Sequence, residues 1–343
     1  MNAVLIIDKP AGLTSHDVVN RARRILRERS IGHLGTLDPL ATGVLPLVTG
    51  SLTRLAQFYT ASEKTYEGTI RFGFATDTYD AEGEPTTTPQ AVSLSREAIE
   101  AVAARFRGVI EQTPPAFSAK KIKGVPAYKL ARQQKEVILQ PVQVEIKEFE
   151  ILAVELDRVR FRARVASGTY MRSVAHDMGR ELACGAHLES LRRTSVAEFT
   201  LEDAHTLDEL ANLWLRPAQN LRHPDPKVCH PDPSFPFLEG KGSAGEGPRV
   251  AEVAATVPPD FESHFVHPRK LLPQFPSVTA DEPTAARIRS GRTVNLPDVS
   301  RARHVKVFAG QRDLIAIATR VAGTLFHAKL VLCGGTDTAV RRP

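Results

Sequence analysis

The chain has 343 residues, of which 42% are hydrophobic and 24% are charged, and its formal net charge is +6. This composition is normal for a globular protein, and the length suits about two domains. The three cysteines, Cys184, Cys229 and Cys333, are too widely spaced for a disulfide framework or a CxxC zinc signature. Their low number favours a reducing, cytoplasmic setting.

The N-terminus does not resemble a signal peptide, because Met1–Asp8 lacks a basic region and its apolar run stops at Asp8. No apolar run in the chain approaches the length that spans a bilayer, so we expect no membrane partner. The positive net charge fits a polyanionic partner, and a solvated basic surface explains it equally well.

The first predicted elements are a buried strand and an amphipathic helix. Ala3–Ile7 has the apolar run of a short strand, and Ser15 is a plausible N-cap for a helix that ends near Glu28. Arginines 21, 23, 24, 27 and 29 lie mostly off the apolar face of this helix. They form either a solvated face or a surface that contacts phosphates.

The next segment, Gly32–Pro46, is a loop that contains one carboxylate. Three glycines and two prolines make a continuous helix or strand improbable here. Asp38 stands directly before Pro39, which restricts its backbone and presents the carboxylate on a constrained turn. On these residues alone, Asp38 reads as an ordinary turn residue.

Alternating and helical periodicities then predict the rest of this half of the chain. Strands are expected at 44–48, 66–74, 142–152 and 159–166, and helices from residue 51, at 95–106 and at 128–134, with a lysine-bearing loop at 112–123. The acidic turn at 76–83 lacks calcium-loop spacing, so we expect no metal there.

The segment Ser167–Asp177 is predicted to be a junction from strand through turn to helix. Gly168 permits the turn, Thr169 can cap, and the helix should end near Leu182. Arg172 then lies in the first helical turn, where a cation is unfavourable with the helix dipole. One interpretation is that Arg172 has a dedicated anionic partner, a carboxylate or a phosphate. The other is that it is an ordinary surface arginine.

The last part of the chain changes composition twice. Residues 188–194 are expected to lead into another strand, and a helix at 206–215 follows. The next segment, 216–270, is rich in Pro, Gly and His and reads as a linker or insertion that we expect to be mobile. Within it, Cys229, His223 and His230 have no second ligand pair, so a metal site is not expected. From 271 onward a helix at 279–290 and strands at 294–296, 305–308, 314–318 and 325–332 predict a small, mostly β module.

No cofactor motif is present in the sequence. GxxxxGK[ST], a strand-linked GxGxxG, HExxH and GxSxG are all missing, so we expect no nucleotide cofactor and no resident cofactor of another kind. Any chemistry should run on side chains alone.

Several long motifs occur in order along the first part of the chain. They are Asp-Lys-Pro-x-Gly-x-Thr-Ser at 8–15, the loop Gly32–Pro46, Lys64-Thr65-Tyr66, and the segments 76–83, 114–120, 167–172 and 184–194. Together they resemble the TruB family of tRNA pseudouridine synthases over about residues 3–215. The C-terminal module is similar to the PUA-like RNA-binding domain of such proteins. The long 216–270 segment departs from the family pattern.

The resemblance implies an α+β fold. A catalytic domain at 1–215 would have a central mixed or antiparallel sheet flanked by helices, followed by the linker at 216–270 and a PUA-like domain at 271–343. The implied reaction is isomerisation of uridine 55 in the T loop of tRNA to pseudouridine after the base is flipped out of its stack. The implied partner is the T stem-loop of tRNA, and we expect a monomer without a cofactor.

The resemblance also assigns catalytic roles residue by residue. Asp38 matches the catalytic aspartate. The sequence leaves open whether this carboxylate attacks the sugar or the base. Arg172 matches the arginine that pairs with it, and such a pair should lower the carboxylate pKa. Tyr66 matches the tyrosine that stacks on the target base and assists removal of the C5 proton.

Binding and structural roles follow in the same way. Leu191 matches an apolar residue of the pocket, His33 a histidine at the T loop, and Lys64 is expected to contact RNA. Lys9, Pro10 and Gly35 belong to motifs with an expected structural role, and no residue is expected to bind a metal.

Other functions remain open at this point. One is a related synthase guided by a separate RNA and acting on ribosomal RNA, and another is a non-catalytic RNA-binding or RNA-folding protein. The weakest is a metal-dependent hydrolase using Asp77, Asp80 and His176, which lack ligand spacing.

Overall fold

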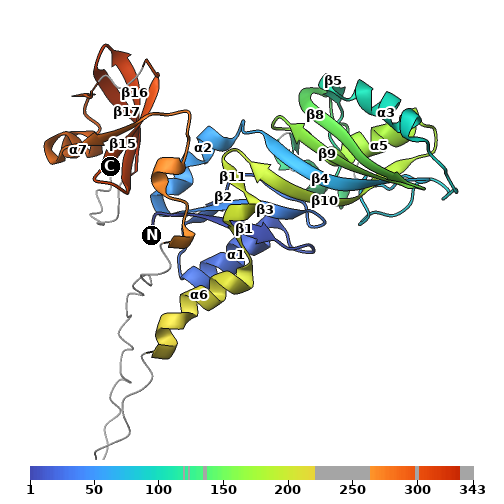
Figure 1. Ribbon diagram of the computed structural model, residues 1–343, viewed down its shortest axis with the longest axis horizontal. Coiled ribbons are helices and arrows are strands. Elements are labelled where there is room, and N and C mark those ends of the chain that lie inside the picture. Colours follow the sequence, from blue (N-terminus) through green and yellow to red (C-terminus); the bar gives the residue numbers. More distant parts are fainter. Residues whose placement is uncertain (119, 123, 134–136, 221–262, 298–300, 333–343) are drawn as a thin grey trace, which may run out of the picture.

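A long mixed sheet forms the body of the protein (Figure 1). The computed structural model describes residues 1–118, 120–122, 124–133, 137–220, 263–297 and 301–332. The sheet contains β1 (Val4–Lys9), β2 (Ile31–His33), β3 (Thr42–Thr49), β4 (Lys64–Phe72), β5 (Gly108–Gln112), β8 (Val142–Glu155), β9 (Arg158–Val165), β10 (Ala186–Val196), β11 (Phe199–Thr200) and β12 (Ala204–His205). Its order is β12-β1-β3-β10-β4-β9-β8-β5, with β2 beside β3 and β11 beside β10.

Most neighbouring strands of this sheet are antiparallel. The pairs β1/β12 and β3/β10 are parallel, so the sheet is mixed, as expected. The parallel contact between β3 and β10 lies at the centre of the strand order and places Gly43 opposite Arg193. This central contact brings the loop before β3 to the middle of the molecule.

Helices cover one face of the sheet. They are α1 (Ser15–Leu26), α3 (Arg96–Arg105), α5 (Met171–Glu181) and α6 (Leu207–Asn220). Alternation along β1 sends Leu5 and Ile7 into the core shared with these helices, while Val4 and Ile6 face a second core on the other side. Because both faces of β1 are buried, the apolar run of that strand is continuous.

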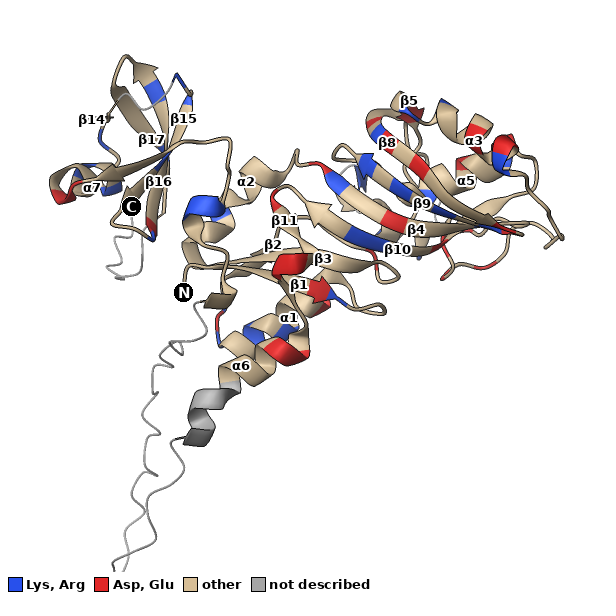
Figure 2. Ribbon diagram, in the orientation of Figure 1, with Lys and Arg blue, Asp and Glu red and all other residues tan. Residues whose placement is uncertain are grey.

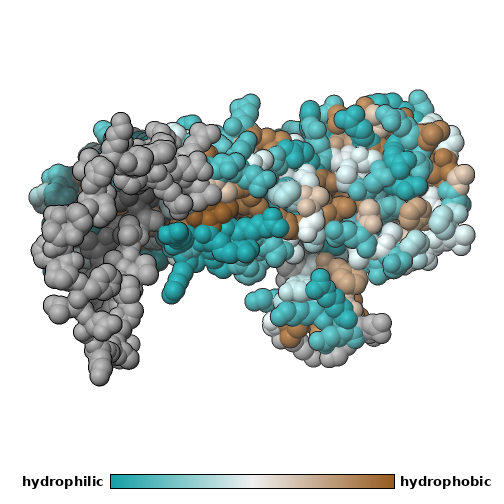
Figure 3. Space-filling model, turned by 90° about the horizontal axis from the view of Figure 1, so that it is seen from below, coloured by the Kyte–Doolittle hydropathy of each residue, from teal (hydrophilic) through white to brown (hydrophobic). Residues whose placement is uncertain are grey.

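Acidic and basic residues are interspersed on strands β4, β9 and β8 (Figure 2), and several of them form ion pairs. Arg162 contacts Glu67, and Arg164 contacts Glu148, both at hydrogen-bond distance. Exposed pairs of this kind contribute little to stability. They do mean that these arginines already have anionic partners. Hydrophilic residues also cover much of the described surface seen from below, with apolar residues in separate patches (Figure 3).

A separate C-terminal domain consists of a five-stranded sheet and one helix. It contains β13 (Ser277–Ala280), α7 (Glu282–Arg289), β14 (Val294–Asn295), β15 (His304–Ala309), β16 (Asp313–Ala322) and β17 (Leu325–Val331), in the sheet order β13-β15-β16-β17-β14. Smaller elements elsewhere are η1 (Gly50–Leu55), α2 (Ala56–Tyr59), β6 (Lys121–Ile122), β7 (Val125–Pro126), α4 (Ala127–Ala131), η2 (Leu201–Asp203) and η4 (Pro268–Lys270).

The second core joins the two domains. Leu271, Leu272 and Phe308 pack there with Val4 and Ile6 of β1. The buried Lys306 ammonium donates hydrogen bonds to the carbonyl oxygens of Arg269 (2.8 Å) and Leu271 (2.6 Å). The chain that enters the C-terminal domain is therefore fixed against both domains.

The α+β class and the additional β domain are confirmed, and several strands were not predicted. Among them, β2 overlaps the start of the segment that was predicted to be a loop. Strand β5 (GVIEQ) is mostly exposed and so lacks an apolar alternation, and the prediction placed part of β13 in a helix. Helix α6 continues past the expected domain end at 215. Of the expected linker, residues 221–262, including Cys229, His223 and His230, lie outside the described residues. The described part just after them is in contact with the body, since the Val266 amide donates to Val4 O at 2.9 Å.

Two expected absences concern the described residues alone. No helix in the described ranges is long and apolar enough to cross a membrane. Within those ranges, no group of three or more His, Cys, Asp or Glu side chains is arranged to hold a metal ion.

Candidate active site

A cavity of about 460 Å³ opens beside the loop before β3. Its volume falls within the range of roughly 300–1,000 Å³ that is typical of ligand sites. The loop, α2, β4, β10 and the N-terminus of α5 form its walls. Seven of the predicted site residues line it: His33, Gly35, Asp38, Lys64, Tyr66, Arg172 and Leu191.

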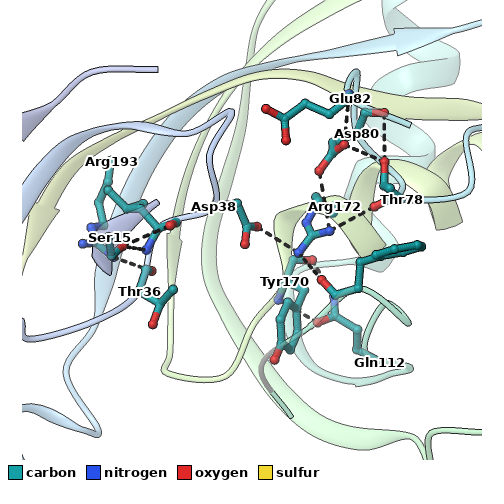
Figure 4. Close-up of polar contacts among 12 residues, drawn as sticks. Ser15, Thr36, Asp38, Thr78, Asp80, Glu82, Gln112, Tyr170, Arg172 and Arg193 are labelled. Atoms are coloured by element: carbon teal, nitrogen blue, oxygen red, sulfur yellow. Dashed lines mark hydrogen bonds and ion pairs between the residues drawn. The ribbon is translucent and has the colours of Figure 1, made fainter. Parts of the chain in front are cut away.

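Ser15 holds the loop from behind. Its hydroxyl accepts a hydrogen bond from the Leu37 amide (2.8 Å) and donates one to Leu37 O (3.1 Å) (Figure 4). The prediction that Ser15 caps the helix is therefore wrong. Thr14 is the N-cap and forms a capping box with Asp17, which frees Ser15 to fix the residue before Asp38.

Arg193 holds the same loop from β10. Its side chain is fully buried, and its guanidinium donates to Val44 O (2.8 Å), Thr36 O (3.2 Å) and Gly35 O (3.1 Å). A buried cation must have its donors satisfied, and here two carbonyls of the loop, Gly35 and Thr36, and one of β3, Val44, accept these hydrogen bonds. The residue pattern gave no sign of this role beyond the Arg-Arg-Thr sequence itself.

Lys9 and Pro10 do not line the cavity. The buried Lys9 ammonium donates to the carbonyl oxygens of Pro10 (2.9 Å), Leu13 (2.6 Å) and Pro39 (3.2 Å). Burial lowers the pKa of Lys9 to about 8, and the nearby Asp38 opposes this shift. Lys9 thus ties the turn after β1 to the residue that follows Asp38.

The close packing of the loop on β10 can be tested by adding a side chain at Gly43. Gly43 has φ of +98°, and a Cβ there would lie 2.2 Å from Arg193 O. We expect Gly43→Ala to lower the free energy of unfolding by about 3 kcal/mol or more, because backbone strain and a clash with backbone add. Gly12→Ala is the matched control, since Gly12 has φ of +79° but open space around it. It should cost only about 1–2 kcal/mol in urea unfolding, and equal losses would contradict the clash.

Arg172 links the loop to a second carboxylate. Its guanidinium Nη2 lies 2.9 Å from Asp38 Oδ2, and Nη1 lies 3.5 Å from Asp80 Oδ2. Nη1 also donates to Thr78 O (3.1 Å) and Nη2 to Phe117 O (2.9 Å). The dedicated carboxylate partner that the position of Arg172 implied is present, and there are two of them (Figure 4).

Asp80 was not predicted as part of the site. Its side chain is 4% exposed, and its Oδ1 accepts hydrogen bonds from the Thr78 hydroxyl (2.6 Å) and the Glu82 amide (3.1 Å). The signal in the sequence was the acidic turn at 76–83, which is one of the motifs that carry the family resemblance, but no role in the site was assigned to Asp80 from it. In the fold, the same turn supplies a buried anion to Arg172.

The N-terminus of α5 is satisfied from β5. Tyr170 is the N-cap and has no side-chain cap, so the expected cap at Thr169 is wrong. The Thr169 hydroxyl instead donates to Ala166 O at 3.0 Å. Buried Gln112 accepts from the Tyr170 amide (2.8 Å) and donates to Tyr170 O (3.1 Å), which fixes the first turn that carries Arg172.

Burial dominates the electrostatics of Asp38. The protein around the carboxylate disfavours its charged form and raises its pKa, and Asp80 acts in the same direction, while Arg172 and Lys9 oppose the shift. Pairing with Arg172 does lower the pKa of Asp38, as expected, but burial outweighs this effect. The side chain is still 42% exposed to the cavity, so a ligand can reach it.

The other predicted residues form the walls around Asp38. Tyr66 lies on β4 and is 8% exposed, and Leu191 lies on β10. Burial and Arg193 lower the pKa of His33, whose Nδ1 has no partner among the described residues. Lys64 donates to Ser62 O at 2.6 Å, and burial lowers its pKa to about 8.

Comparisons with known proteins agree with this architecture. A model described as "TruB family pseudouridylate synthase (N terminal domain)" matches residues 23–171, and "tRNA pseudouridylate synthase B C-terminal domain" matches 172–223. The chain is 45% identical to tRNA pseudouridine synthase B of Solibacter usitatus, over 97% of this chain and 100% of that protein. It is 46% identical to the same-named protein of Opitutus terrae, over 63% of this chain and 89% of that one.

Solved structures show the same fold. A chain of an H/ACA RNP bound to a substrate RNA containing 2′-deoxyuridine matches with a TM-score of 0.66 at 21% identity, covering 97% of this chain and 85% of that one. A chain of a Cbf5-Nop10-Gar1 complex matches with a TM-score of 0.65 at 22% identity, covering 96% and 85%. From the family models and the near full-length relative together, this chain belongs to the TruB family of pseudouridylate synthases.

Proposed function

We propose that this protein converts uridine 55 in the T loop of tRNA to pseudouridine. The observation that carries the proposal is Asp38, a carboxylate on a rigid loop that faces a cavity and is paired with buried Arg172. The relatives at 45–46% identity are named tRNA pseudouridine synthase B, which favours tRNA as the substrate. The position within tRNA and the T stem-loop are what the resemblance of the sequence motifs to the TruB family implies.

The proposed reaction is an internal rearrangement, so atoms balance without a co-reactant. The bond from uracil N1 to ribose C1′ breaks, the base turns, and a bond from C5 to C1′ forms. The C5 proton is lost, and N1 carries a proton in the product. Asp38 supplies the anionic group that attacks or stabilises the separated pieces, and Arg172 orients it.

The walls of the cavity suit a flipped base. An extruded base is held by stacking and apolar contacts, and we assign these to Tyr66 and Leu191, which flank Asp38. Tyr66 also assists removal of the C5 proton. His33 and Lys64 contact the RNA around the base, and Lys9, Pro10 and Gly35 keep the loop in place.

The test is to incubate the purified protein with an unmodified tRNA transcript and to map pseudouridine in the product. We expect modification at position 55 with no other component. A protein guided by a separate RNA would leave the bare transcript unchanged, and a non-catalytic RNA-binding protein would bind it without conversion. Retained activity in a chelator would dispose of a metal-dependent hydrolase.

Two further properties belong to the proposal. The protein acts as a monomer, which sedimentation of the free chain and of its tRNA complex would test. It acts in the cytoplasm, where its few cysteines remain reduced.

The pH dependence of the reaction follows from Asp38. Because the pKa of Asp38 is raised, its carboxylate becomes protonated at a higher pH than the ordinary value of about 3.9. We therefore expect the rate constant at saturating tRNA to fall as pH decreases, with an apparent pKa above that value. A profile that stays flat down to about pH 4 would contradict this assignment.

A second pH effect should appear in RNA affinity. Lys64, with a pKa of about 8, loses its charge as pH rises through that value, so binding of tRNA should weaken there. Lys64→Arg keeps its charge at this pH and serves as the control. Equal weakening in the wild type and in this variant would exclude Lys64 as the titrating contact.

A further inference from the structure

The acidic turn that supplies Asp80 is also held by an aromatic stack. The rings of Tyr79 and His176 lie parallel, with centroids 3.8 Å apart and an interplanar angle of 15°. Tyr79 is the direct neighbour of Thr78 and Asp80, both of which contact Arg172. The stack therefore lies beside the charged network of the proposed active site.

The stack and the ion pair come from the same helix. Arg172 and His176 are four residues apart on α5, so their side chains share one face of the helix. One reaches Asp80 and Thr78 O, and the other reaches Tyr79. Helix α5 thus contacts the turn at two points one helical turn apart, and movement at one point must disturb the other.

The backbone of Tyr79 is unusual for a large residue. Its φ is +64°, in the left-handed region that side chains other than glycine rarely adopt. This conformation turns the chain so that Thr78 O and Asp80 both face Arg172. Two bonds with β10, from the Leu188 amide to Tyr79 O (3.0 Å) and from the Ala81 amide to Leu188 O (3.0 Å), fix the turn along that strand. They do not attach it to α5.

Among the residues that the structure describes, no hydrogen bond or ion pair accounts for the placement of His176. Its Nδ1 is buried and has no hydrogen-bond partner among the described residues, so its identified contact in the turn is the ring of Tyr79. Asp177 and Arg180, the charged neighbours on α5, pair with each other at 3.5 Å. The ring therefore acts through packing rather than through a hydrogen bond.

We propose that Tyr79 and His176 are positioning residues that keep the acidic turn against α5, so that Asp80 and Thr78 hold Arg172 in place for Asp38. This inference rests on the proposed function, because it assigns the effect of the stack to the Asp38–Arg172 pair. Neither ring lines the cavity, and neither touches the reacting base.

The test uses two variants that remove the stack in different ways. His176→Ala deletes one ring, and Tyr79→Gly deletes the other while suiting the left-handed backbone. Each should lower the single-turnover rate constant about 10- to 100-fold, as small misplacements of catalytic groups do, with unchanged affinity for tRNA. His176→Phe restores a stacked ring without a titrating group and should restore the rate.

The pH profile of the single-turnover rate constant distinguishes a misplaced Arg172 from a general loss of protein stability. The charged groups around Asp38 are Arg172, which belongs to α5, Asp80 and Glu82, which belong to the acidic turn, and Lys9, which belongs to β1. If Arg172 is displaced, Asp38 loses its main favourable partner, and the acidic limb of the rate should move to higher pH. Phe149→Leu, which disturbs the Phe149–Phe161 pair in the core, should lower the melting temperature but leave this limb in place.

The outcomes are distinct. An unchanged rate and acidic limb in both His176→Ala and Tyr79→Gly would overturn the proposal, as would failure of His176→Phe to restore the rate when it is folded. A wild-type protein that does not modify the transcript would instead overturn the proposed function.

Discussion

Replacing Asp38 with asparagine is expected to abolish pseudouridine formation while tRNA binding persists. The substitution keeps the shape of the side chain and removes the charge that the reaction needs, so we expect the rate constant to fall by about 10⁴-fold or more. Single-turnover conversion of a tRNA transcript measures this loss, and filter binding measures the affinity. The walls of the cavity, including Tyr66 and Leu191, are not altered by the change.

The folded protein should tolerate this loss of charge. Because burial raises the pKa of Asp38, the folded state disfavours its ionised form, and stability falls as pH rises through the interval between the unfolded and folded pKa values. At neutral pH a neutral asparagine removes this cost, so the variant should melt no lower than the wild type. Such a gain is common where a functional site carries strain.

Asp77 provides the matched control. It lies in the acidic turn but is exposed, and its Oδ1 accepts a hydrogen bond from the Glu84 amide at 2.9 Å, which an asparagine oxygen can also accept. Asp77→Asn should retain a nearly normal rate. If Asp38→Asn converts uridine at a similar rate to this control, the assignment of Asp38 is wrong.

Some residues of this site could be predicted from the sequence, and others could not. Asp38 and Arg172 were assigned from the resemblance of the ordered motifs to the TruB family, because the local sequence alone left Asp38 as a turn residue and Arg172 with two possible roles. Ser15 and Arg193 were not, because their partners are carbonyl and amide groups of the loop, 22 or about 150 residues away along the chain. Every residue carries the same backbone N–H and C=O groups, so the sequence does not indicate which of them a side chain will bind. Such contacts can be identified only from the folded structure.

Prediction of the strands from the sequence is limited in the same way. Strands with clear alternation, such as β4 and β9, were predicted nearly to their ends. Strand β5 was not, since it is an edge strand with mostly exposed residues. Its last residue, Gln112, nevertheless fixes the first turn of α5. A locally weak element can therefore be decisive for the site, because its effect arises from the tertiary contact.

Replacing Arg172 with methionine should damage both stability and activity, for separable reasons. Arg172 is 6% exposed and Asp80 is 4% exposed, so the variant leaves the Asp80 carboxylate buried without its cation. Removing one partner of a buried ion pair costs about 3–5 kcal/mol, and urea unfolding should show a loss of this size. The rate should fall as well, since Asp38 loses the guanidinium 2.9 Å from its Oδ2.

The double variant Arg172→Met with Asp80→Asn separates the two effects. Without the buried charge, most of the lost stability should return, because an uncharged asparagine can keep the hydrogen bonds from the Thr78 hydroxyl and the Glu82 amide. The rate should not return, since Asp38 still lacks its partner. If stability and rate recover together, Arg172 serves the fold alone. If neither recovers, the cost lies in its bonds to Thr78 O and Phe117 O.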